Sequence, residues 1–165
     1  MAITAGQYAA LDTSAYGEVL NKCAQAVIDL DLTSIKGRVY VLQRTDDFAL
    51  VTGAGNLPLC IVSMSAESAN DQEGNLNTST VHYPVMIAMI WGTDRGQRSN
   101  LAEQLLHRQS VARKFRKQRP FSGMTNGDLK KTTIRAGEPY VAEAVRKALD
   151  AQWLLVDATV EEVFP

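Results

Sequence analysis

Apolar residues recur at helical spacing shortly after the first dozen residues. One face would carry Tyr16, Val19, Leu20, Cys23, Val27 and Leu30, and the opposite face Glu18, Lys22, Gln25 and Asp29. Asp12, Thr13 or Ser14 can cap the first turn. We therefore expect an amphipathic helix that runs to about Leu30, preceded by a flexible arm at residues 1–12.

Several runs rich in β-forming residues predict strands. The runs at 38–44 and 59–63 are short, and a weaker one covers 48–52. Residues 81–91 are apolar with little interruption, which indicates a strand buried on both faces. At 153–164 apolar and polar residues alternate, which is typical of a strand in a sheet with one open face.

A second helix is predicted from about residue 98 or 100 to Lys117, and Pro120 stops it. Its apolar face is expected to comprise Leu101, Leu105, Ala112 and Phe115, with Arg108 in the middle. A third, shorter helix can begin at Pro139 and run to about Leu149.

Two polar stretches, at about 65–80 and 120–135, are expected to form long loops, and the first is alternatively the tip of a hairpin. A chain of 165 residues suits one domain with a real core. The order of elements predicts a single α+β domain over residues 13–165. Its sheet would be mainly antiparallel, with two or three helices packed on one face.

Charge is distributed unevenly along the chain. Residues 95–135 hold eleven of the seventeen Lys and Arg residues and only two acids, for a formal charge of +9. The remainder has six basic and sixteen acidic residues, for a formal charge of −10. Such a division suits binding to an anionic partner. It equally suits copies of the chain packed head to tail, with the basic side of one against the acidic side of the next.

The sequence has no features of export or membrane insertion. Its start lacks the basic residues and long apolar run of a signal peptide. The longest apolar run, Val85–Trp91, is too short to span a bilayer. We expect the protein to be made and kept, or assembled, in a reducing cytoplasm, with no membrane partner. Cys23 and Cys60 each lie in an apolar pattern, so burial is expected rather than a disulfide or a metal site.

Residues typical of catalytic sites are few. His82 and His107 have no Cys, His or carboxylate at metal-ligand spacing, so a structural or surface role is expected for each. The acids of Asp46–Asp47 and Glu161–Glu162 are adjacent, and adjacent residues on a strand face opposite sides, which does not suit acid–base catalysis. We expect no enzyme, metal or cofactor. The alternative is an enzyme site assembled from distant residues, which a deep pocket lined by polar groups would favour.

The basic region has three interpretations. Cations near a helix C-terminus are stabilised by the helix dipole, so a simple solvated face is one of them. Binding to a nucleic-acid backbone by the basic helix at 108–119 is the second. The third is a protein interface, for which arginine is well suited because it pairs readily with carboxylates in partly buried contacts. The candidate interface residues are Arg108, Arg113, Lys114, Arg116, Lys117, Arg119, Lys130 and Lys131.

Four elements give the chain its layout: the helix Ser14–Leu30, the strand His82–Trp91, the helix from Leu101, and a late strand that ends with Val160–Pro165. This layout resembles the tail-terminator and head–tail joining proteins of tailed bacteriophages, over most of the chain. The resemblance implies a small α+β subunit without catalytic residues. Such a subunit forms a ring, expected to be a hexamer, that ends the tail tube and presents a surface to the neck.

The resemblance also implies where the protein acts and with what. It implies a structural protein of the virion tail or neck, assembled in the host cytoplasm. Its partners would be further copies of itself, the tail-tube protein and a neck or connector protein, with passing DNA as another contact. The alternative function from a different class is a nucleic-acid-binding protein, for which the basic helix would be the binding surface.

Overall fold

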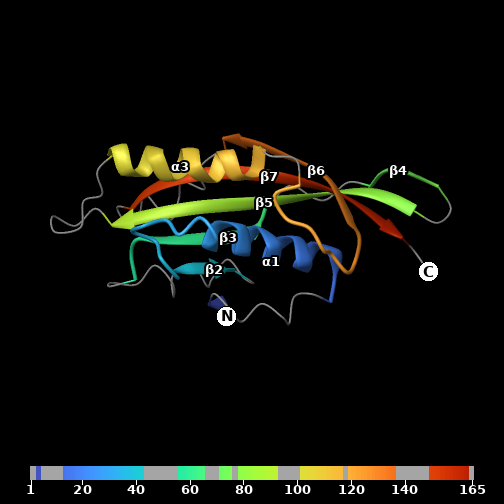
Figure 1. Cartoon of the computed structure of the whole chain (residues 1–165), viewed down its shortest axis with the longest axis horizontal. Helices are drawn as coiled ribbons and strands as arrows, with labels where there is room; N and C mark the ends of the chain where they lie inside the picture. The colour runs from blue at the N-terminus through green and yellow to red at the C-terminus, as the bar shows by residue number, and fades with distance from the viewer. Residues whose placement is uncertain are drawn as a thin grey trace.

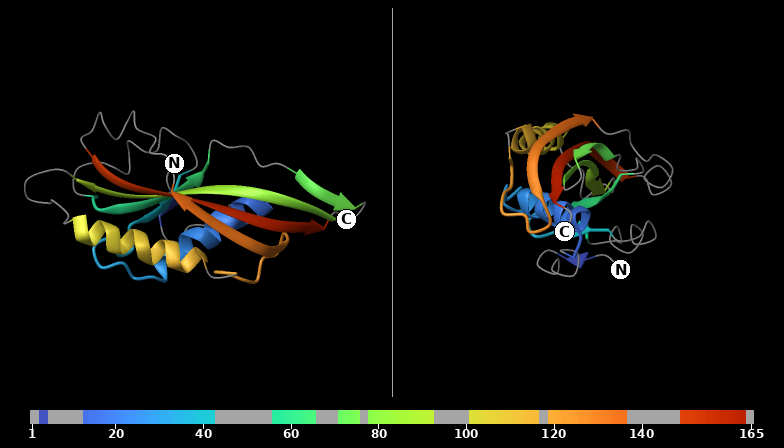
Figure 2. Two further views of the ribbon diagram at one scale, coloured as in Figure 1. Left: turned by 90° about the horizontal axis from the view of Figure 1, so that it is seen from above. Right: turned by 90° about the vertical axis from the view of Figure 1, so that its right-hand side faces the viewer.

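The computed structural model describes residues 3–4, 13–42, 56–65, 71–75, 78–92, 101–116, 119–136 and 149–163. The strand expected at 48–52 lies outside these residues, as do most of the arm at 1–12 and the helix expected from Pro139 up to residue 148. The described residues form one twisted sheet with two helices on the same face (Figures 1 and 2). The predicted α+β class is confirmed.

The strands of the described chain are β1 (Ile3–Thr4), β2 (Val39–Val41), β3 (Leu59–Met64), β4 (Asp71–Asn75), β5 (Thr78–Gly92), β6 (Asp128–Ala136) and β7 (Leu149–Val163). Their order across the sheet is β1-β2-β3-β5-β7-β6, and β4 pairs with β5 beside this path. β2 and β3 run parallel, and the other described pairs are antiparallel. The sheet is therefore mainly antiparallel, as predicted.

β5 and β7 give the molecule its elongated shape (Figure 1). They pair along their whole length, from Thr78 opposite Val163 to Gly92 opposite Leu149. Each strand has 15 residues, and at about 3.3 Å per residue the pair spans roughly 50 Å. The second half of β5 is buried on both faces, as its apolar sequence predicts.

The main core lies between the sheet and the helices. There Val85, Ile87 and Met89 of β5 are fully buried with α1 (Ala15–Ile28) and with the end of α3 (Leu101–Arg116). A smaller apolar cluster, which includes Ile61 and Ile90, occupies the opposite face of the sheet. This division follows from the alternation of side chains along a strand.

Both cysteines are buried free thiols, as expected. Burial raises the pKa of the Cys60 thiol to about 12 and raises the pKa of Cys23 as well, because a thiolate is poorly solvated in the core. Neither native thiol is therefore suited to react with an external oxidant at neutral pH.

α1 begins where its sequence predicts. The side chain of Ser14 accepts a hydrogen bond from the Gly17 backbone N–H at 3.1 Å, and the N–H of Asp29 donates to the Gln25 carbonyl in the last turn. One part of the prediction is wrong. Glu18, assigned to the polar face, is only 3% exposed, because its carboxylate binds backbone groups of a distant segment.

The two predicted long loops are in large part strands. Within 65–80, Asp71–Asn75 forms β4 and pairs with the start of β5, so the hairpin alternative is correct. Within 120–135, the residues from Asp128 onward form β6 and pair with β7. The sequence of β6 is mostly polar because this strand lies at the edge of the sheet, where only its Leu129 and Thr132 side chains are buried.

α3 coincides with the predicted second helix, but a different face of it is buried. Phe115 and Ala112 are buried as expected, whereas Leu101 is 63% exposed and Leu105 is 49% exposed. The inward stripe instead contains Gln104, His107, Val111 and Phe115. The periodicity of α3 is compatible with two different buried stripes, because helical spacing also relates residues 104, 107, 111 and 115.

Candidate functional site

The outward face of α3 exposes three leucines, although its inward face is partly polar. Gln104 and His107 are about 95% buried, and Gln104 Oε1 accepts a hydrogen bond from Gln152 Nε2 of β7 at 3.3 Å. The His107 ring packs near Trp91, with a centroid distance of 6.2 Å. Leu106 is 62% exposed, like Leu101 before it. A helix that buries Gln and His while exposing leucines has a surface suited to a partner.

A groove runs along this outward face, between α3 and β6. We call it the leucine–arginine groove. Its volume is about 610 Å³, and Leu154 of β7 is also among its lining residues. The side chains that give it its character are Leu105, Leu106, Arg108, Arg116, Ile134 and Arg135. Because the lining contains three arginines and no acid, the groove is both apolar and cationic.

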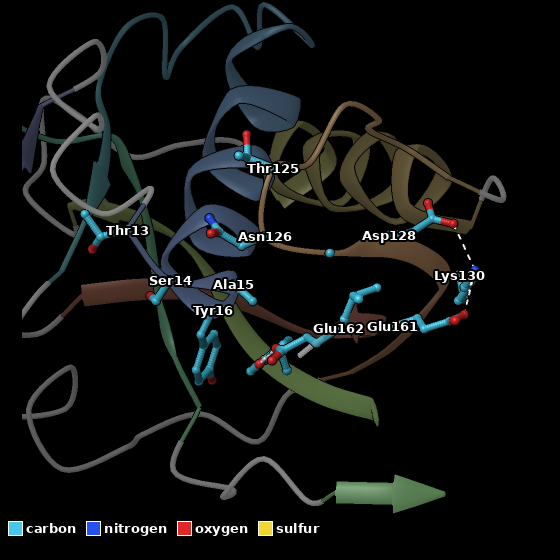
Figure 3. Close-up of a pocket in the computed structure, with 13 residues that line it drawn as sticks. Thr13, Ser14, Ala15, Tyr16, Thr125, Asn126, Asp128, Lys130, Glu161 and Glu162 are labelled. Carbon is cyan, nitrogen blue, oxygen red and sulfur yellow. Dashed lines mark hydrogen bonds and ion pairs between the residues drawn. The ribbon is translucent and has the colours of Figure 1, made fainter. Parts of the chain in front are cut away.

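A second cavity lies near the other end of the sheet, where β7 ends beside the first turn of α1 (Figures 1 and 3). We call it the acidic cleft. Its volume is about 720 Å³. Three carboxylates line it, from Asp128, Glu161 and Glu162, together with one cation, Lys130. Val163 also lines it and is 72% exposed. The cleft therefore carries the charge opposite to that of the groove.

Lys130 bridges two of the cleft carboxylates. Its Nζ lies 2.9 Å from Asp128 Oδ2 and 2.7 Å from Glu161 Oε2 (Figure 3). The hydrogen bond to Glu161, and then that to Asp128, raises the pKa of Lys130. The hydrogen bond from Lys130 lowers the pKa of Asp128, and Arg119 adds to this effect. The bridge therefore stabilises the fold above the ordinary carboxyl pKa and is lost in strong acid or strong base.

Glu162 is held differently, because it accepts a hydrogen bond from the Tyr83 hydroxyl. Tyr83 packs against Tyr16 of α1 with a ring-centroid distance of 4.7 Å, and the Tyr16 hydroxyl donates to the Pro84 carbonyl. Burial raises the pKa of Tyr16 to about 12, so this hydroxyl remains a donor at neutral pH. Two tyrosines thus form an aromatic wall of the cleft.

The segment at 125–127, which forms another wall, is fixed by Glu18 of α1. The Glu18 carboxylate accepts from the backbone N–H of Thr125 at 2.6 Å and from that of Asn126 at 2.9 Å. The Asn126 side-chain amide donates a third bond at 3.1 Å. Periodicity alone could not indicate this role, since the partners lie more than 100 residues away in the sequence.

Gly127 is required by the close approach of this wall to β7. A Cβ at this position would lie 2.6 Å from Val160 Cγ1 and 3.0 Å from the Glu161 carbonyl oxygen, and the backbone φ is +157°. We expect Gly127→Ala to lower the free energy of unfolding by about 1–3 kcal/mol, measured by urea denaturation.

The matched control is Gly123→Ala in the same loop. Gly123 has φ +71°, but a Cβ there would meet no atom within 4 Å, so only backbone strain is added. Equal losses for the two variants would show that the contact with β7 has no energetic role.

Three of the eight predicted interface residues line one of the two cavities. Arg108, which is half-buried, and Arg116, which is exposed, line the groove. Lys130 instead lines the acidic cleft and is paired within its own chain. Arg135 was not among the predicted residues, although it lines the groove from β6.

The other predicted cations lie outside both cavities or outside the described residues. Arg113 is exposed and Lys114 is half-buried on α3, and Lys131 is exposed on β6. Arg119 is exposed shortly after α3, with a positive φ of 57°. Lys117 falls in a gap of the described chain.

His82 of β5 lies beside Asp157 and Thr159 of β7. Its Nδ1 is 3.4 Å from Asp157 Oδ1 and 3.3 Å from Thr159 Oγ1. A nucleophile–base–carboxylate relay requires the hydroxyl and the carboxylate to contact different ring nitrogens. Since both contact Nδ1 here, these three residues do not form such a relay.

Among the residues that the structure describes, no group of three or more His, Cys, Asp or Glu side chains is placed to hold a metal ion. No described helix is long and apolar enough to cross a membrane. Comparison of the whole sequence with protein-family models and with curated proteins finds no match in either case.

Proposed function

We propose that the protein is a structural subunit that associates with copies of itself, head to tail, into a closed ring. The observation that carries this proposal is the placement of the two cavities. The leucine–arginine groove lies along α3, over one half of the sheet, and the acidic cleft lies near the end of β7 in the other half (Figures 1 and 2).

Electrostatics favours a head-to-tail contact over a symmetric one. A two-fold symmetric contact centred on either surface would bring that surface against its own copy, so that arginines face arginines or carboxylates face carboxylates. A heterologous contact instead joins surfaces of opposite charge, and such contacts give a ring when the rotation between subunits closes. The outward leucines of α3 would add apolar area to the same contact.

The order of elements resembles that of tail-terminator and head–tail joining proteins, and this resemblance suggests where the ring would act. We propose that it is a hexamer in the virion of a tailed bacteriophage, where it ends the tail tube and joins it to the neck. The hairpin of β4 and β5 supports this proposal, because it extends the sheet at the end of the molecule where β7 also ends (Figure 1). It could reach a tube or neck protein above or below the ring.

Electron microscopy of the purified protein at low ionic strength tests the proposal. We expect closed rings of uniform diameter, which bind at one end of isolated tail tubes when the two are mixed. Particles that remain single subunits at high protein concentration, with and without tubes, would contradict a structural ring. Open filaments would contradict closure.

A nucleic-acid-binding role remains the competing function, since Arg113, Arg116 and Arg119 are exposed together near the end of α3. A gel-shift titration over a salt series separates the two functions. Binding to duplex DNA that weakens steeply with salt supports the competing function. Absence of binding at low salt removes it.

A further inference from the structure

We infer that the leucine–arginine groove of one subunit receives the end of β7, residues 161–163, from a second copy. This inference rests on the proposed self-association and specifies its contact. The apolar side chains, the charges and the strand geometry at the groove and at the end of β7 support it.

Exposed hydrophobic residues lie both at the groove and at the end of β7. In the described chain the large exposed hydrophobics are Met64, Leu101, Leu105, Leu106 and Val163. Three of these five lie on α3, at or beside the groove, and one is the last residue of β7. Burying the exposed Val163 side chain against leucines would favour the contact, because apolar area is removed from water.

The charges at the two places are complementary. Arg108, Arg116 and Arg135 line the groove. Glu161 and Glu162 immediately precede Val163 at the end of β7, and both line the acidic cleft. Within their own subunit Glu161 pairs with Lys130 and Glu162 accepts from the Tyr83 hydroxyl, and an ionised carboxylate has acceptor sites for further donors. Arginine can bind a carboxylate with two parallel hydrogen bonds, which fixes the orientation of the two groups as well as their distance.

The end of β7 is also open on one side. The last residue of β7 that pairs with β6 is Glu161, opposite Asp128. Glu162 and Val163 continue beyond it and pair only with Ser79 and Thr78 of β5. Their other backbone edge therefore pairs with no strand of the described chain, and an unpaired strand edge accepts contacts from another molecule.

A β7 end that enters the groove must come from another copy, because the groove and the acidic cleft cannot meet within one subunit. Leu154 lines the groove and Val163 lines the cleft, and both lie on the same extended strand, β7. Val163 lies nine positions after Leu154, a distance of roughly 30 Å along the strand at about 3.3 Å per residue. The strand cannot fold back on itself while it is paired with β5.

Site-specific cross-linking tests the contact directly. Leu106→Cys and Val163→Cys would be made in separate subunits, which are then mixed at low salt under mild oxidation. We expect a disulfide between subunits, because the native cysteines are buried. Met64→Cys, another exposed hydrophobic position at the end of β3, replaces Val163→Cys in the control and should give roughly tenfold less cross-link or lower.

Charge reversal tests the same contact in solution. Arg116→Glu and Glu162→Arg should each weaken association by roughly tenfold or more, and the double variant should recover most of the loss. Lys36→Glu, an exposed change of the same size on the segment after α1, is the control and should have little effect.

The outcomes separate this inference from the function on which it rests. The inferred contact is overturned if Arg116→Glu still forms rings normally. It is also overturned if Met64→Cys cross-links as strongly as Val163→Cys. Neither result affects the proposal that the protein forms a ring. A wild-type protein that does not associate overturns the proposed function, and the contact with it.

Discussion

Replacing Phe115 by alanine is expected to lower the free energy of unfolding by about 3–5 kcal/mol, the usual cost of truncating a buried phenylalanine. Phe115 is 0% exposed in the main core, and its carbonyl accepts a hydrogen bond from Thr132 Oγ1 of β6 at 2.8 Å. The buried side chain and the backbone hydrogen bond both join α3 to the sheet, and the substitution removes only the first of them. Chemical denaturation followed by circular dichroism measures the loss.

The control for this prediction is Leu105→Ala on the same helix. Leu105 belongs to the same predicted apolar face but is 49% exposed, so we expect a change within about 0.5 kcal/mol. A large loss for Leu105→Ala together with a small one for Phe115→Ala would mean that α3 presents the opposite face to the sheet. The leucine–arginine groove would not then exist as described.

Glu18→Ala is expected to lower the free energy of unfolding by about 2–3 kcal/mol, in the range for hydrogen bonds to a charged group. The substitution removes the acceptor of three hydrogen bonds from Thr125 and Asn126. It also leaves a void beside the segment at 125–127. Thermal and urea denaturation give the size of the effect, and amide hydrogen exchange of Thr125 and Asn126 should become faster.

Two control variants test whether the effect comes from the Glu18 carboxylate. Glu18→Gln keeps an acceptor oxygen but not the charge, so we expect about half the loss. Asp29→Asn changes an exposed acid at the end of the same helix and should change the stability by less than about 0.5 kcal/mol. If Glu18→Ala were no more costly than Asp29→Asn, the carboxylate would not be what fixes the wall of the cleft.

The elements with one strong pattern were predictable from the sequence. α1 has a single apolar stripe and a cap at Ser14, and β5 is apolar without a competing pattern. α3 was placed correctly but its orientation was not, because its leucines and its buried stripe both recur at helical spacing. The stripe of α3 that faces the sheet depends on how α3 packs against β6 and β7. The periodicity of the α3 sequence carries no information about that packing.

The candidate site was predictable in part. Arg108 stood out because a cation within an apolar stripe is unusual, and it does line the groove. Lys130 was counted with the basic region, yet it pairs with Asp128 and Glu161 in its own chain. Glu18 and Arg135 were missed because their roles depend on which distant segments meet in the fold. A contact between residues more than 100 positions apart leaves no local signal.

The central claim is that opposite charges on one subunit, at the groove and at the cleft, match across a repeated contact. Sedimentation velocity of the wild-type protein at about 0.1 M and about 1 M salt tests it most directly, because the Debye length falls from about 10 Å to about 3 Å between them. The account predicts one discrete closed oligomer at the lower salt concentration and a shift towards free subunits at the higher. The same single-subunit species at both concentrations, or an oligomer that salt does not weaken, would contradict it.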